Sequence, residues 1–316
     1  MTTAAHPAPT PLARPAGPDH QAGPAPASRE PRPIPVRRVA FDFSNERPYW
    51  VLGEPSLTHL LHALSAAFPD GERMFMDSVA HYRKQITDPA LKKEVARFLA
   101  QEATHAKAHE ELNAWVRAQG FDNEPLLASV KERIALGRKH FPPIMRLAAT
   151  CALEHFTAIM AEQLLTEPEM LAQFDPKMAE LWLWHAIEET EHKSVAFDVY
   201  EHVGGTYPRR VLAMAIITFR FITHVAWMKQ QLMKNDPNVR AAKGLEGLRV
   251  RLQSTWTLWG NPGWFRKLVP AYLDYYRPGF HPWDRDTTEA LRRAREKLGF
   301  DPEGRESVDD RASSAA

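Results

Sequence analysis

The sequence has very little cysteine and almost no net charge. Cys151 is the single cysteine among 316 residues, which excludes an intramolecular disulfide framework and a cysteine-based zinc cluster and fits a reducing compartment. Lys and Arg number 40 against 39 Asp and Glu, so no bulk field attracts nucleic acid or an anionic membrane. We therefore expect a cytoplasmic protein that does not bind nucleic acid.

Several familiar catalytic motifs are also missing. The chain contains no Gly-rich phosphate loop, no H-E-x-x-H motif and no G-x-S-x-G nucleophile elbow. Cys151 lies in an apolar run, where we interpret it as a small core residue rather than a nucleophile. No segment alternates polar and apolar residues over more than a few positions, so the expected fold class is all-α.

Both ends of the chain have the composition of disordered tails. Residues 1–38 are rich in Pro and Ala and have few large apolar side chains, so they bury too little surface to offset the entropy of ordering. They lack the apolar core of a secretory signal, while a role in organelle targeting stays open. Residues 301–316 are polar. We predict a single helical domain over residues 39–300, with a bundle core at about 55–204 and a helical extension at 205–300.

Proline and glycine mark the ends of the predicted helices. One helix opens with Asp-Pro and closes with Gly over residues 88–120, and a second repeats this pattern over residues 175–204. Two more are expected at about 72–87, after a break at "FPDG", and at about 143–165. The intervening "NEPLLASVKERIALGRKHFPP" predicts a connecting helix. That helix supplies the long crossover of a four-helix bundle whose halves are not simply up and down.

The pattern Glu-x-x-His occurs twice. Glu102 and His105 lie in "FLAQEATHAKAHEEL", and Glu189 and His192 lie in "HAIEETEHKS". Residues i and i+3 share a helix face, so each pair can approach one point. A single pair is expected by chance about once in such a chain, and a solvated polar face is the alternative for both. Glu188 competes with Glu189 for pairing with His192, but the stripe that contains Glu189 is more apolar.

Two isolated glutamates complete a known arrangement. Bundles that hold two iron or manganese ions take one Glu from each of two helices and a Glu-x-x-His from each of the other two. Glu72 and Glu154 precede the first and second Glu-x-x-His in the required order. The alternatives are an ion pair of Glu154 with Arg146 or Arg220, and a helix-start position for Glu72. The sequence predicts a dinuclear site with six metal ligands: Glu72, Glu102, His105, Glu154, Glu189 and His192.

Two further histidines flank the Glu-x-x-His pairs. His109 follows His105 by one helical turn, and His185 precedes Glu189 by one turn. Either could be an extra metal ligand, could orient a ligand through its ring N–H, or could be an ordinary packed histidine. Glu162 lies further along the helix of the second isolated glutamate, and we interpret it as solvent-facing.

The chain resembles the bacterial family of predicted metal-dependent hydrolases over roughly residues 40–290. The resemblance is carried by "FPDGERMFMDSVAHYRKQITDPALKKEVARFLAQEATHAKAHEELN", "EHFTA", "HAIEETEHKSVAFDVY" and "RPGFHPWD". It implies a fold similar to the ferritin-like dinuclear carboxylate proteins, the same six ligands, and hydrolysis as the family's named reaction. His109 and His185 exceed the simplest ferritin-like pattern, so the number of ligands stays open.

Three functions are compatible with this ligand set. The favoured one is a dinuclear non-haem oxidoreductase with two Fe ions, or Fe and Mn, that reacts with O₂ and a small apolar organic substrate. Hydrolysis by two metal ions is the second. The third is a non-catalytic protein that handles iron or associates with membranes. A homodimer is compatible with each of the three.

The extension after the bundle contains a strongly apolar helix. Residues 211–228 approach membrane-spanning length but include Arg220 and His224. We favour a buried helix of the bundle, with membrane-surface association as the next alternative and a true span last. The Trp- and Tyr-rich region 246–283 is expected to wall a substrate cavity, and a charged helix follows it.

Overall fold

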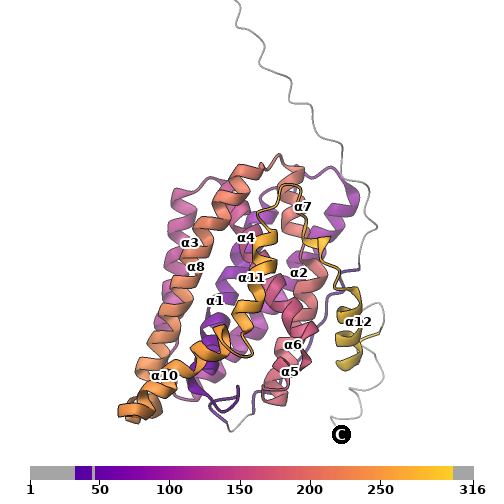
Figure 1. Ribbon diagram of the computed structural model, residues 1–316. Helices are drawn as coiled ribbons and strands as arrows, with labels where there is room; N and C mark the ends of the chain where they lie inside the picture. Colours follow the sequence, from indigo (N-terminus) through magenta and orange to yellow (C-terminus); the bar gives the residue numbers. More distant parts are fainter. Residues whose placement is uncertain (1–32, 45–46, 302–316) are drawn as a thin grey trace, which may run out of the picture. The chain divides into compact units, whose positions relative to one another are not determined.

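The computed structural model describes residues 33–44 and 47–301, and it confirms the all-α prediction. Helices form nearly all the regular structure of these residues (Figure 1), and no β-strand occurs within them. An isolated bridge joins Val51 to Phe174. Of the tails predicted at 1–38 and 301–316, residues 1–32 and 302–316 lie outside the described residues.

Four helical segments carry the Glu and His residues of the predicted site. They are α1 (Pro55–Ala80), α2 (Pro89–Ala118), α4 (Pro143–Thr166) and α6 (Pro176–His192), which continues after a turn as α7 (Val195–His202). The predicted crossover is α3 (Glu124–His140), which packs on α1. The other elements are α5 (Pro168–Leu171), α8 (Tyr207–Asn235), α9 (Pro237–Ala241), α10 (Gly244–Trp259), α11 (Trp264–Asp274), a 3₁₀ turn (Pro282–Asp284) and α12 (Thr288–Lys297).

Local sequence signals set the ends of these helices. The Asp88 side chain accepts a hydrogen bond from the Ala90 N–H, and Asp175 does the same for Lys177. A proline then occupies the first position of each helix, where no intrahelical donor is needed. Gly120 follows the end of α2 with φ of 89°, a conformation that costs glycine little. The two predicted Asp-Pro helix starts are therefore confirmed.

The expected break at "FPDG" is wrong, because α1 runs through Pro69 without interruption. A proline inside a helix leaves the carbonyl four residues earlier without its usual N–H donor. Here that carbonyl belongs to Ser65, and it accepts a hydrogen bond of 2.9 Å from Asn113 Nδ2 of α2. Because α2 replaces the missing donor, Glu72 lies in the middle of α1 rather than at a helix start.

Two other boundaries differ from prediction. The helix expected over 175–204 is interrupted by a turn at residues 193–194, which separates α6 from α7. Residues 33–38, assigned to the N-terminal tail, have no regular secondary structure, but Ile34 and Arg37 are buried. The packed domain therefore begins before residue 39.

The apolar helix α8 is only partly buried. Both α4 and α8 are long and apolar enough to cross a membrane by length and composition. In the most apolar stretch of each helix, 56% of the residues of α4 are buried but only 28% of those of α8. The prediction of a buried helix at 211–228 therefore holds for one side of α8, because Leu212, Phe219 and Ile222 are exposed on the other.

Candidate metal centre

The four helical segments bring the predicted ligands together in two buried groups. Glu72, His105 and His185 offer ligand atoms that lie within 4.8 Å of one another. Glu102, Glu189 and His192 form a second group of the same size. These residues lie far apart in the sequence, and each is inaccessible or nearly so. The site is therefore built by packing of α1, α2 and α6 against one another.

Glu154 and Glu189 connect the groups. Glu154 Oε2 of α4 lies 3.7 Å from His192 Nε2, which itself lies 3.2 Å from Glu102 Oε1. Glu189 Oε2 lies 3.6 Å from His192 Nε2, whereas its other oxygen lies 2.9 Å from His185 Nε2. One carboxylate thus faces both groups.

Most of the polar atoms that face the centre of this cluster have no hydrogen-bond partner within the described part of the chain. They are both oxygens of Glu72, Glu102 and Glu154, Oε2 of Glu189, Nδ1 of His105 and Nε2 of His192. Burying an unpaired carboxylate costs several kcal/mol, so native proteins rarely leave such a set of acceptors unmatched. Two divalent cations would satisfy these atoms and neutralise the four carboxylates, so the residues present fit a pair of metal ions.

The carboxyl groups of the cluster have shifted pKa values because they are buried close to one another. Burial, followed by repulsion from neighbouring carboxylates, raises the pKa values of Glu72, Glu102 and Glu154 well above their usual range. Burial acts on Glu189 in the same direction, but its hydrogen bond with His185 and its attraction to the nearby His192 outweigh burial and lower its pKa. Without metal ions, the cluster therefore retains protons that metal binding would release.

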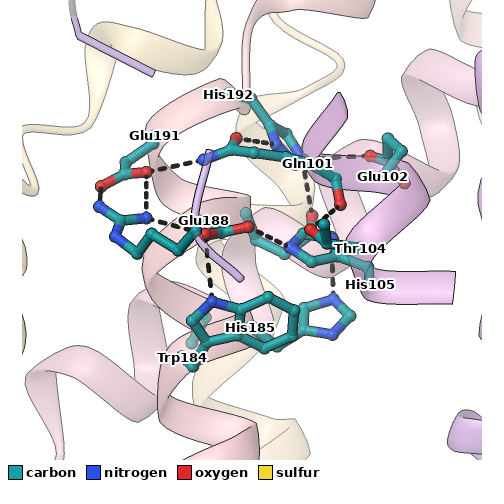
Figure 2. Close-up of polar contacts among 12 residues, drawn as sticks. Gln101, Glu102, Thr104, His105, Trp184, His185, Glu188, Glu191 and His192 are labelled. Atoms are coloured by element: carbon teal, nitrogen blue, oxygen red, sulfur yellow. Dashed lines mark hydrogen bonds and ion pairs between the residues drawn. The ribbon is translucent and has the colours of Figure 1, made fainter. Parts of the chain in front are cut away.

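His105 and His192 each use one ring nitrogen for a hydrogen bond that points away from the centre of the cluster. His105 Nε2 donates to Glu188 Oε2 at 3.1 Å, which leaves Nδ1 facing the cluster. His192 Nδ1 donates to Gln101 Oε1 at 2.8 Å, which leaves Nε2 facing the cluster. Figure 2 shows both arrangements. In the neutral ring, fixing one nitrogen as a donor makes the other an acceptor, which is the form a metal requires.

A buried layer of charges supports these contacts. Arg37 donates to Glu188 Oε1 at 2.9 Å and to Glu191 Oε1 at 2.6 Å. Glu191 also accepts from Gln101 and from Arg295, and Glu188 accepts from Trp184 Nε1 at 3.1 Å (Figure 2). Sequence reasoning missed this layer. The available signal was the acidic run "EETEH", which is too polar for a buried helix unless each carboxylate has a partner.

His185 and His109 lie differently with respect to the cluster. His185 Nε2 faces Glu189, and its Nδ1 lies 2.7 Å from His109 Nε2. His109 Nδ1 contacts Ser65 Oγ at 3.0 Å, and Ser65 in turn donates to Asn113 Oδ1. Because Asn113 Oδ1 can only accept, the chain of donors runs outward from His185. His185 thus belongs to the cluster, whereas His109 lies outside it and forms a hydrogen bond with His185.

Burial and ion pairing decide between the alternatives for the acidic residues. Glu102 and His105 are not on a solvated face, since both are fully buried. Glu154 forms no ion pair with Arg146 or Arg220 among the described residues. The expectation for Glu162 is wrong, because it is partly buried and forms an ion pair with Arg285 away from the cluster.

Other features close to the cluster are apolar. Cys151 is buried, and its thiol contacts the Ala196 carbonyl, as expected for a core residue. A cavity of about 190 Å³ between α1, α3, α4 and α8 reaches Glu72. A second cavity of about 70 Å³ reaches His185 and Glu189, and part of its wall comes from α10 and α11. Phe68 and Thr157 line both cavities, so the cluster lies between two apolar spaces.

A family model described as "Predicted metal-dependent hydrolase" matches residues 35–286. The chain belongs to this family. The match begins just before the buried Arg37 and extends past the 3₁₀ turn, so it includes every residue of the cluster and the layer of charges except Arg295. No curated protein and no solved structure matches the chain. Family membership and the buried Glu and His clusters together support a metal-dependent enzyme.

Proposed function

We propose that the protein binds two metal ions, both Fe or Fe and Mn, and uses them with O₂ to oxidise an apolar organic substrate. The observation that carries the proposal is the set of buried carboxylate oxygens without hydrogen-bond partners, located between two apolar cavities. A carboxylate-rich site suits ions that change between the divalent and trivalent states, because hard anionic ligands stabilise the higher charge.

The two groups of residues suggest how the ions would be shared. Glu72, His105 and His185 would hold one ion, and Glu154 and His192 the other. Glu189 directs one oxygen toward each group, so it would help to hold both ions. Glu102, which lies 3.2 Å from His192, would add a further carboxylate to the site.

When bound, such a pair of ions would supply the redox chemistry that reduces O₂. Insertion of one oxygen atom into a C–H bond takes two electrons from the substrate and two from an external reductant, and the second oxygen atom leaves as water. The residues of the chain would orient and protect this reaction. His109 and Glu188 fix the rings of two ligands, and the apolar cavities exclude bulk water from the ions.

The larger cavity suggests the kind of substrate. Its wall includes Phe68, Phe75, Ile217 and Phe221, so it fits an apolar body. Arg133 and Arg220 also line it, and neither has an acidic partner within the described residues. Both cations contribute to lowering the pKa of His224 after burial, the main cause, so they lie at the same end. We infer a substrate with an apolar body and a negatively charged group.

Hydrolysis is the second candidate function, because the family's description names it. Two ions could polarise an ester or a phosphoester and activate water. The larger cavity offers little to such a reaction, since its acidic members are the proposed ligand Glu72 and Asp77, which forms an ion pair with Arg138. No further carboxylate among the described lining residues is available as a general base.

Anaerobic reconstitution separates the two functions. The full-length protein is loaded with Fe(II), exposed to O₂ with a reductant and a panel of apolar carboxylic acids, and compared with matched ester and phosphoester substrates. Oxidation predicts O₂ uptake and an oxygenated product, both lost in Glu154→Ala and kept in Glu111→Ala, an exposed change on α2. Ester cleavage without O₂ would establish hydrolysis. Metal binding with neither activity would refute the enzyme proposal.

A further inference from the structure

Helix α10 has its apolar and polar faces reversed for a helix of a soluble protein. Its outward residues are Leu245, Leu248, Leu252, Trp256 and Trp259, which are 86%, 52%, 53%, 67% and 54% exposed. At 100° per residue, these five side chains fall within about 80° of the helix circumference. We call them the outer stripe of α10. On the opposite side Gly247, Ser254 and Thr257 are buried.

Buried hydrogen bonds fix the rotation of α10 about its axis. Ser254 Oγ is fully buried, and it lies 2.6 Å from Ser56 Oγ of α1. It also accepts a hydrogen bond of 2.8 Å from Lys229 Nζ of α8. Rotating the helix to bury the outer stripe would break these contacts and expose the apolar Leu258. The outward direction of the stripe is therefore a property of the packed fold.

The segment that contains the outer stripe is strongly basic. Residues 207–277, which include α8, α10 and α11, contain twelve Lys and Arg but three Asp and Glu. The rest of the chain contains 28 basic and 36 acidic residues. Lys234, Arg240 and Lys243 are exposed at the junction between α8 and α10 and form no ion pair with described residues. An almost neutral protein thus carries a segment rich in basic residues, and three of these residues are exposed close to the start of α10.

The helices next to α10 also expose apolar side chains. α11, which packs against α10, exposes Val269 and Leu273. α11 is joined to α8 by a hydrogen bond between Tyr272 and Thr218, and α8 exposes Phe219 and other apolar residues. Figure 1 shows the three helices on the side drawn in front.

We propose that this surface docks the protein onto an anionic lipid bilayer, with the outer stripe of α10 inserted at the headgroup boundary. Amphipathic helices with Leu and Trp on one face and Lys or Arg nearby bind such boundaries in this orientation. Each basic residue close to the membrane adds attraction to anionic lipids. A second copy of the chain is a poorer occupant, because a two-fold interface would bring two strongly basic surfaces together.

The proposed docking surface shares α8 with the larger cavity. Ala213, Ile217 and Phe221 of α8 line the cavity, whereas Leu212 and Phe219 face outward. A docked protein would therefore hold one wall of its cavity against the membrane. The docking itself does not depend on the proposed chemistry, because neither the outer stripe nor the basic residues belong to the metal cluster.

Vesicle flotation with the full-length protein tests the proposal. The probes are vesicles of phosphatidylglycerol and phosphatidylcholine in equal parts, and vesicles of phosphatidylcholine alone. We expect binding to the anionic vesicles that weakens when NaCl is raised from about 0.1 to 0.5 M. The double variant Leu248→Glu, Leu252→Glu should lower the partition coefficient by about tenfold or more. The control Leu136→Glu changes a leucine that is 44% exposed on α3 and should bind as wild type.

Circular dichroism and thermal unfolding establish that each variant is folded. The proposal is wrong if the wild type floats with neither vesicle, or if the α10 double variant and the α3 control bind equally. It is also wrong if light scattering shows a dimer that the double variant converts to monomer without a change in vesicle binding. That result would assign the outer stripe to a second copy of the chain.

Discussion

Replacing Arg37 by Met tests whether the N-terminal segment holds the site together. Arg37 and both of its carboxylate partners are at most 1% exposed at the side chain. Removing one member of a buried ion pair typically costs 3–5 kcal/mol. Glu191 keeps its second cation, Arg295, so Glu188 alone loses its charged partner and the low end of that range applies. We expect a loss of about 3 kcal/mol, which for a domain of this size lowers Tm by about 10 °C.

The effect should reach the metal cluster as well. Glu188 accepts the hydrogen bond that orients His105, and loss of such a partner commonly lowers metal affinity about 10–100-fold. Differential scanning calorimetry gives Tm, and competition with a chelator gives the affinity. Arg38→Met is the matched control, because Arg38 is exposed one residue away. If both variants unfold within about 2 °C of each other, the N-terminal segment does not stabilise the site as described.

Two further predictions concern protonation and ring orientation. The raised pKa values of the three cluster glutamates mean that metal-free folded protein binds more protons than the unfolded chain, so its stability should fall from pH 7 to pH 9. His192, whose pKa is raised to about 9, acts in the same direction. One retained proton lowers the free energy of unfolding by about 1.4 kcal/mol per pH unit. Metal-loaded protein should not show this decrease. If calorimetry gives the same pH dependence with and without metal, the cluster glutamates are not its cause. His185→Ala should lose about half of the bound metal, whereas His109→Ala should keep both ions with affinity lowered about 10–100-fold. Equal metal loss in both variants would show that His185 is no more a metal ligand than His109.

Features that depend only on neighbouring residues could be predicted from the sequence. Asp88 with Pro89 predicted a helix start because the cap and the missing proline donor act within one turn. The Glu-x-x-His spacing predicted that Glu102 and His105 share a face for the same reason. The family description obtained by comparison agrees with the one inferred from the motifs.

Features that depend on distant partners could not be predicted in this way. Pro69 suggested a break because the donor that replaces its N–H comes from Asn113 on another helix. Arg37 was assigned to a tail because its partners lie more than 150 residues away. The net charge of the whole chain likewise concealed the basic segment at 207–277, since an acidic remainder balances it.

The metal content of the purified protein tests the central claim most directly. Inductively coupled plasma mass spectrometry, with protein quantified by amino-acid analysis, should find about two Fe or Mn ions per chain after reconstitution. Glu154→Ala should fall to about one ion or fewer, while the exposed control Glu111→Ala should keep two. Folded wild-type protein that binds no metal after reconstitution, or Glu154→Ala that binds as much as the control, would contradict the account.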